Sequence, residues 1–272
     1  MKKTMGRLIA LTLVLALGLA GLAGCGQQGE SKNVKTDPFA QLQDRGYVVM
    51  GMDDTFAPMG FRDKNGELVG FDIDLAKEVF QRIGLEVRFQ PIEWTMKESE
   101  LNNGNIDLIW NGYSITEERK AKVAFSEPYL GNRQVIITLA ESPIAVKADL
   151  AGKKVAIQNE SSAVEAVNKE PELVASLDGG EPVLLDTNNE CFMDLESKRV
   201  DAVVADEVLV KYVIKERGPE KFKILEENFG EEEYGIGVRK EDTKLLAEIN
   251  KAMDEMREDG KYDEIYQKWF AN

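Results

Sequence analysis

Short apolar runs alternate with helical patterns along most of the chain. The runs predict strands at residues 47–52, 85–92, 106–110, 134–140, 154–158, 183–186, 201–205 and 234–239. Between the first two, apolar residues recur at helical spacing after Asp72 and the pattern closes at Gly84. Further helices are predicted at 98–101, 161–168, 190–199, 208–217, 245–256 and 262–269. This alternation predicts an α/β architecture.

The apolar run 106–110 ends in a turn of unusual chemistry. It is followed by Asn111, Gly112 and Ser114, with Arg119 a few residues further on. Such a strand end offers backbone N–H groups, a hydroxyl and a guanidinium to one point, which suits a carboxylate. An arginine after a strand is more often a solvated surface charge, so the motif needs support from the rest of the chain.

The N-terminal residues have the pattern of a targeting segment. Basic residues at 2, 3 and 7 precede an apolar stretch over 8–22, and Leu22-Ala23-Gly24-Cys25 resembles the bacterial lipobox. A membrane-spanning helix is the alternative, although the run is short for one. We expect residues 1–24 to be a lipoprotein signal peptide and 25–37 a flexible tether. An acylated Cys25 would anchor the chain to the outer face of the cell membrane.

Composition excludes several function classes. The chain has 34 Lys+Arg against 49 Asp+Glu, a net charge of −15, which disfavours nucleic acid as a partner. It contains no histidine, which argues against a Ser-His-Asp triad and most zinc sites. No metal, cofactor or catalytic residue is therefore expected. Cys191 is the only cysteine after Cys25 and is expected to be a small buried core residue, so no intramolecular disulfide is predicted.

Six segments together resemble a known family. They are GMDDTFAP at 51–58, VGFDIDLA at 69–76, SITEER at 114–119, FSEPY at 125–129, RVDAVVAD at 199–206 and GKYDEIY at 260–266. In this order and spacing they are similar to the family 3 solute-binding proteins, which deliver polar amino acids to ABC importers. The resemblance covers about residues 47–270.

The resemblance implies a two-lobed, type II periplasmic-binding-protein-like fold with the ligand in the cleft between the lobes. Lobe 1 would comprise residues 38–128 and 235–272, and lobe 2 residues 134–230. The crossings at 129–133 and 231–234 would act as hinges that let the lobes close.

The resemblance also implies how the ligand main chain is held. Arg119 matches the arginine that clamps the α-carboxylate, and Ser114, Ser161 and Ser162 match further donors to it. Ser161 stands at a predicted helix start, where a plain N-cap is the alternative role. Asp206 matches the carboxylate that takes the α-ammonium, helped by the backbone carbonyl of Gly112; capping the next helix is the alternative for Asp206.

The ligand side chain would lie between Phe56 and Trp94, which could otherwise be core residues. Asp53, Asp72, Asn111 and Gln158 are expected at its far end, with Asp54 and Glu93 as possible additions. Several acids there favour a cationic or amide tail, so glutamine, arginine and lysine are the candidate ligands.

We therefore expect a monomeric, lipid-anchored receptor that closes on a free polar L-amino acid and delivers it to an ABC permease. It would be extracellular in a Gram-positive-type envelope and periplasmic otherwise. A dehydratase acting on prephenate or arogenate is the enzymatic alternative, with Glu93, Glu98 or Asp53 as general acid. A chemosensory receptor of the same fold is a third reading.

Overall fold

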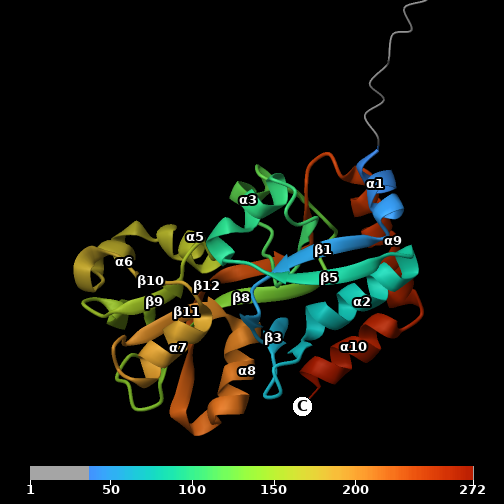
Figure 1. Cartoon of the computed structure of the whole chain (residues 1–272). Helices are drawn as coiled ribbons and strands as arrows, with labels where there is room; N and C mark the ends of the chain where they lie inside the picture. The colour runs from blue at the N-terminus through green and yellow to red at the C-terminus, as the bar shows by residue number, and fades with distance from the viewer. Residues whose placement is uncertain (1–36, 272) are drawn as a thin grey trace, which may run out of the picture. The chain divides into compact units, whose positions relative to one another are not determined.

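The computed structural model describes residues 37–271, which form two lobes, each built around one sheet (Figure 1). The predicted signal peptide, most of the tether and the lipidation site Cys25 lie outside the described residues. Within residues 37–271 no helix combines the length and the apolar character that crossing a membrane requires.

Lobe 1 contains a five-stranded mixed sheet. Its strands, in spatial order, are β5 (Glu86–Pro91), β1 (Tyr47–Met52), β6 (Leu108–Ile109), β13 (Gly237–Val238) and β7 (Ala124–Phe125). β1 runs parallel to both β5 and β6, whereas β13 is antiparallel to β6 and β7. A small sheet of β2 (Thr55–Phe56), β3 (Gly60–Arg62) and β4 (Leu68–Val69) adjoins it.

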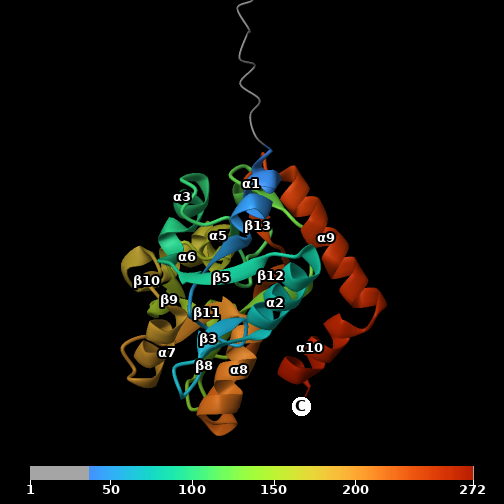
Figure 2. The same cartoon turned by 45° about the vertical axis from the view of Figure 1, so that its right-hand side comes forward.

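The helices of lobe 1 are α1 (Pro38–Arg45), α2 (Phe71–Ile83), α3 (Lys97–Asn102), α4 (Glu117–Lys120), α9 (Thr243–Glu258) and α10 (Lys261–Phe270). A single 3₁₀ turn, η1 (Trp94–Met96), precedes α3. Helix α2 ends at Gly84, which has a left-handed φ of 83°, as the sequence pattern predicts. The C-terminal helices α9 and α10 pack on α2, so the end of the chain returns to the first lobe (Figure 2).

Lobe 2 contains the second five-stranded sheet. Its strands, in spatial order, are β10 (Val183–Leu185), β9 (Val155–Gln158), β11 (Ala202–Asp206), β8 (Leu130–Leu139) and β12 (Phe222–Tyr234). Its helices are α5 (Ser162–Asn168), α6 (Pro171–Ser176), α7 (Asn188–Glu196) and α8 (Glu207–Arg217), with 3₁₀ turns η2 (Lys147–Leu150), η3 (Asp178–Gly180) and η4 (Pro219–Lys221). Helices α5 and α6 lie on one side of the sheet, and α7 and α8 lie on the other (Figure 1).

Both faces of the second sheet are buried, which explains its continuous apolar runs. Ile136 and Val204 pack with α5, whereas Ile137 and Val203 belong to the core on the α7 and α8 side. Cys191 of α7 lies fully buried in the core on the α7 and α8 side and forms no disulfide. Burial raises the pKa of its thiol to about 12, in keeping with a packing role.

The chain passes from one sheet to the other twice, between β7 and β8 and again between β12 and β13. The residues expected to form hinges pair with each other there, with Glu232 opposite Asn132 and Tyr234 opposite Leu130. Sequence reasoning missed most of β12. Its acidic residues and its register shifts near Asn228 hide the alternation that marks a strand.

Candidate functional site

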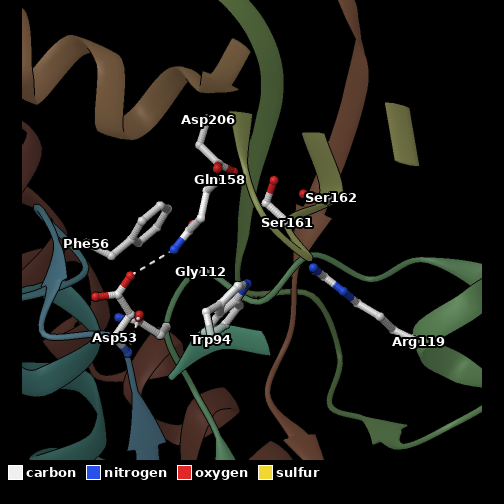
Figure 3. Close-up of a pocket in the computed structure, with 10 residues that line it drawn as sticks. Asp53, Phe56, Trp94, Gly112, Arg119, Gln158, Ser161, Ser162 and Asp206 are labelled. Atoms are coloured by element: carbon white, nitrogen blue, oxygen red, sulfur yellow. Dashed lines mark hydrogen bonds between the residues drawn. The ribbon is translucent and has the colours of Figure 1, made fainter. Parts of the chain in front are cut away.

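Ten residues from both lobes line one cavity (Figure 3). They are Asp53, Phe56, Trp94, Asn111, Gly112, Arg119, Gln158, Ser161, Ser162 and Asp206. Four of them stand at or just after the carboxyl ends of parallel strands, namely Asp53 after β1, Asn111 after β6, Gln158 on β9 and Asp206 on β11. The first two belong to the sheet of lobe 1 and the last two to the sheet of lobe 2, and ligands in open α/β sheets bind beyond such carboxyl ends.

Arg119 brings a buried positive charge to the cavity. It lies on α4, whose N-cap Thr116 accepts from the Arg119 backbone N–H, and the residue is only 2% exposed. One terminal nitrogen donates to the Ser114 carbonyl and the other to the Glu160 carbonyl, each at 3.1 Å. The guanidinium carbon lies 4.6 Å from the centre of the Tyr113 ring. These contacts hold the fork in place, while its Nε makes no hydrogen bond and lies 3.9 Å from Glu165 Oε1.

Ser161 and Ser162 present hydroxyl groups from the start of α5. Ser161 occupies the N-cap position, but its side chain makes no capping hydrogen bond. Its Oγ is buried without a partner, in a residue that is 8% exposed and lines the cavity. The plain capping role is therefore not realised, and this hydroxyl is available to a bound group.

Asp206 brings a buried negative charge from lobe 2. Its Oδ1 accepts hydrogen bonds from Asn132 Nδ2 (2.6 Å), Gln134 Nε2 (3.1 Å) and Tyr234 Oη (2.7 Å). It stands at the N-cap of α8 but makes no side-chain capping bond there either. Burial raises its pKa well above the ordinary value, and the neighbouring Glu232 raises it further. A carboxylate in this setting is stabilised by any cation that reaches it.

A chain of polar side chains links the lobes at another side of the cavity. Gln158 Nε2 donates to Asp53 Oδ2 at 3.0 Å, a bond drawn as a dashed line in Figure 3. Asn188 Nδ2 in turn donates to Gln158 Oε1 at 2.7 Å, and Asn111 Oδ1 accepts from the Asp53 backbone N–H. Burial raises the pKa of Asp53, while bonds from Thr55 and Gln158 oppose that effect. Acceptors and amides therefore dominate this region.

The two aromatic residues each combine cavity lining with core packing. Phe56 belongs to the main hydrophobic core, and Trp94 packs edge-on against Tyr113 with ring centroids 5.8 Å apart. Gly112 lies beside them with a left-handed φ of 57°. A Cβ at this position would come within 2.7 Å of Phe56 Cε1, so both backbone conformation and space require glycine.

Two residues expected in the site do not line the cavity. Asp72 lies behind it, fully buried, where its Oδ2 accepts from the Gly112 N–H (2.8 Å) and from Tyr129 Oη (3.0 Å). Ser114 lies beside it, with its Oγ 2.9 Å from Ser162 Oγ. Both residues therefore support cavity-lining neighbours. The possible additions also lie elsewhere, and Asp54 pairs with the exposed Arg62 at 2.6 Å.

The lobes contact each other around the cavity. The buried Lys97 donates its Nζ to the carbonyl of Glu160 in lobe 2 at 3.1 Å, the same carbonyl that Arg119 contacts. Glu160 has a left-handed φ of 55°, and its carbonyl accepts from both cations. Desolvation, followed by the charge of Arg119, lowers the pKa of Lys97 to about 8. Thr116 Oγ1 adds a bond to Glu165 at 3.2 Å, so closure is held by several inter-lobe bonds.

Sequence reasoning missed four polar residues that contact the cavity lining. Asn132, Gln134 and Glu232 surround Asp206, and Asn188 holds Gln158. For Asn188 a signal was present, because Thr187 and Glu190 form a capping box that marks the start of α7. For the other three the sequence offered no comparable signal, since they meet only through the pairing of β8 and β12.

Comparison with known proteins finds similar proteins whose names state that they bind an amino acid or are bound to one. The ABC transporter glutamine-binding protein of Bacillus subtilis (strain 168) is 34% identical over 275 residues, covering 97% of each chain. A histidine-bound substrate-binding protein of an ABC uptake transporter from Streptococcus pneumoniae is 40% identical, with a TM-score of 0.85 over 88% of this chain and 98% of that one. An ancestral arginine-binding protein bound to glutamine is 42% identical, with a TM-score of 0.77 over 84% and 99%.

These structures share the two-lobed, type II fold described above. The family description "Bacterial extracellular solute-binding proteins, family 3" matches residues 48–272. The match spans both lobes and every residue of the cavity. The chain belongs to the family 3 bacterial extracellular solute-binding proteins.

Proposed function

We propose that this protein binds a free polar L-amino acid between its lobes and delivers it to an ABC permease. The observation that supports this most strongly is the pair of unlike charges at one cavity. Arg119 of lobe 1 and Asp206 of lobe 2 are both buried and both line it. A free amino acid is the ligand class that presents a carboxylate and an ammonium on neighbouring atoms, so it satisfies both charges at once.

The α-carboxylate would lie against the guanidinium of Arg119 and the hydroxyls of Ser161 and Ser162. The Oγ of Ser161 supplies a donor that the protein itself leaves unused, and the Nε of Arg119 makes no hydrogen bond within the protein. The α-ammonium would donate to Asp206 and to the Gly112 carbonyl. Ser114 would act through Ser162, whose hydroxyl it contacts.

The ligand side chain would pass Phe56 and Trp94 toward Asp53, Asn111 and Gln158. A carboxylate tail would meet the negative charge of Asp53 in a buried setting, where like charges repel strongly. An amide or cationic tail would donate hydrogen bonds to the same groups. Glutamine, arginine and lysine are therefore the proposed ligands, and the glutamine-binding and arginine-binding names of the similar proteins support that choice.

The remaining parts of the proposal concern movement and location. The paired segments 129–133 and 231–234 would act as hinges between lobe 1 (38–128 and 235–272) and lobe 2 (134–230). The family is extracellular, and an acyl chain on Cys25 would keep this monomeric protein at the membrane near its permease.

Catalysis receives less support from the site. Of the three residues considered as general acid, only Asp53 lines the cavity. It already accepts bonds from Thr55 and Gln158, while Glu98 accepts one from Tyr113 Oη at 2.9 Å. The similar proteins described above are transport-associated binding proteins.

The direct test is titration calorimetry against all twenty amino acids, using protein that lacks residues 1–25 and has been refolded to remove bound ligand. We expect strong binding of glutamine or a basic amino acid, and loss of that binding in Arg119→Ala. Arg88→Ala is the matched control, because Arg88 is half-exposed and pairs with Glu86 on the surface of β5. If no amino acid binds, the proposal is wrong, and conversion of prephenate or arogenate becomes the next assay.

A further inference from the structure

Glu232 is an acidic residue at the crossing between the lobes that differs from its neighbours. It lies on β12 opposite Asn132, and its side chain is half-buried against the cavity-lining residues. Glu231 and Glu233, on either side, are exposed. Because side chains alternate along a strand, Glu232 alone of the three turns toward the site.

The Oε1 atom of Glu232 collects four hydrogen bonds. It accepts from Ser114 Oγ (2.7 Å), Asn132 Nδ2 (2.7 Å), Gln134 Nε2 (2.8 Å) and Ser162 Oγ (3.3 Å). A carboxylate held by this many donors is a fixed part of the site and does not sample solvent freely. It is also in direct contact with Ser162, which lines the cavity.

Glu232 and Asp206 share their donors. The amide nitrogens of Asn132 and Gln134 each donate to both carboxyl groups. The charge of Glu232 beside it raises the pKa of Asp206 beyond the effect of burial. Asp206 therefore holds its proton more tightly than an ordinary aspartate, and Glu232 is part of the cause.

No cation in residues 37–271 forms an ion pair with either acid. The nearest positive group on the cavity side is Arg119, which is bonded to two carbonyl oxygens. In the groove on the outer side of Glu232, Arg133 pairs with Glu207 at 2.6 Å and Lys120 pairs with Glu117 at 2.8 Å.

The other titratable groups around the pair are acidic or neutral. Tyr234 on β12 donates to Asp206, and its own pKa is raised well above the ordinary value by burial. Glu231 faces the outer groove, and Glu165 of α5 lies toward Arg119. The carboxyl groups of Asp206 and Glu232 thus have no cationic partner among the described residues.

A second observation indicates that the cavity receives a polar ligand. Ser161 Oγ lines the same cavity, is buried and has no partner. The Oε1 atom of Gln134, whose amide joins the two acids, is likewise buried and unpartnered. Buried polar groups are normally satisfied, so the cavity is built for a polar molecule that the protein does not supply.

We propose that Glu232 is a second acid of the ammonium site, and that the α-ammonium of a bound amino acid replaces a proton held on Asp206 beside Glu232. The ammonium donates to Asp206 beside Glu232, the proton leaves to the buffer, and Asp206 is then ionised. This rests on the proposed function for the identity of the cation. It adds that binding is coupled to release of one proton and strengthens as the pH rises.

The test is titration calorimetry with L-glutamine and with L-arginine in two buffers that differ in ionisation enthalpy. For the unchanged protein we expect release of about one proton and an affinity that rises up to about tenfold per pH unit on the acidic side. Glu232→Gln should release fewer protons, and the pH dependence of its binding should move to lower pH, because Asp206 loses the neighbouring charge but stays buried. Glu233→Gln, which removes an exposed acid from the same strand, should behave as the unchanged protein. Equal proton release in Glu232→Gln and the unchanged protein would overturn the proposal.

A measurement without ligand separates this proposal from the proposed function. The side-chain carboxyl carbons, labelled with ¹³C, are titrated by NMR in the refolded protein. We expect Asp206 to titrate well above the usual carboxyl range, and at lower pH in Glu232→Gln. That result would stand even if no amino acid bound. An Asp206 signal that titrates in the usual range would contradict a proton held on Asp206, whatever the calorimetry showed for binding.

Discussion

Asp72 is a buried acid behind the cavity, and its effect on the free energy of unfolding can be measured. Its side chain is fully buried, and the backbone N–H of Gly112 and the hydroxyl of Tyr129 do not compensate for the lost hydration. Burial raises the pKa of Asp72 from 3.8 to about 7. In the unchanged protein, the contribution of Asp72 to the free energy of unfolding falls as the pH rises. We predict that Asp72→Asn abolishes this fall.

The sign and size follow from linkage. Because the folded state holds the Asp72 proton more tightly than the unfolded state, this group favours folding most below about pH 4. Its contribution to the free energy of unfolding falls as the pH rises to about 7 and is constant above that. At about 1.36 kcal/mol per pH unit, the difference between 3.8 and about 7 amounts to about 4 kcal/mol.

The assay is urea unfolding of both proteins at a series of pH values. An asparagine at this position can still accept from Gly112 and Tyr129, and any fixed cost of its amide is the same at every pH. The stability of Asp72→Asn relative to the unchanged protein should therefore rise by about 4 kcal/mol between about pH 4 and about pH 8. Asp44→Asn, in an exposed position on α1, should show no such trend. A stability difference for Asp72→Asn that stays constant with pH would refute the reasoning.

Three further predictions concern binding and closure, each measured by calorimetry with glutamine, arginine and lysine. Arg119→Lys should weaken binding about a hundredfold, because an ammonium cannot keep the planar fork that bridges two carbonyls and a carboxylate; affinity within a few-fold of the unchanged protein would contradict the clamp. Asp53→Asn should weaken a basic ligand about tenfold more than glutamine, since only the cationic tail loses an ion pair; equal losses would place the tail elsewhere. Lys97→Met should weaken every ligand by about fivefold through loss of the inter-lobe bond to Glu160, with exposed Lys64→Met as control; unchanged affinity would show that the bond does not support closure.

Local pattern was sufficient for much of the architecture. The runs 134–140 and 201–205 are apolar without interruption because helices cover both faces of their sheet, and each forms much of one strand in the structure. The end of α2 at Gly84 could be predicted equally well, since the left-handed position after a helix favours glycine. Strand 234–239 was overestimated, because Tyr234 is the last residue of β12 and only Gly237–Val238 form a strand after it.

The cavity residues were predicted mainly from the family resemblance. Asp53 and Asn111 follow strands of the first sheet, whereas Gln158 and Asp206 end strands of the second, so parallel pairing brings each pair to one end of its own sheet. The roles given to Ser161 and Asp206 could not be separated from helix capping by sequence, because the same residue types serve both. Only the structure shows that neither side chain caps its helix.

By itself, the sequence determined the α/β class, the strand ends that carry polar residues and the family resemblance, because these depend on neighbours within a few turns of chain. Tertiary structure decided that Asp72 stands behind Gly112 and that Glu232 joins Asp206. The bond from Asn132 to Glu232 spans 100 residues of sequence and exists only because β8 pairs with β12 in one register. A shift of one residue would turn Glu232 to the opposite face, and no local pattern in an acidic strand specifies that choice.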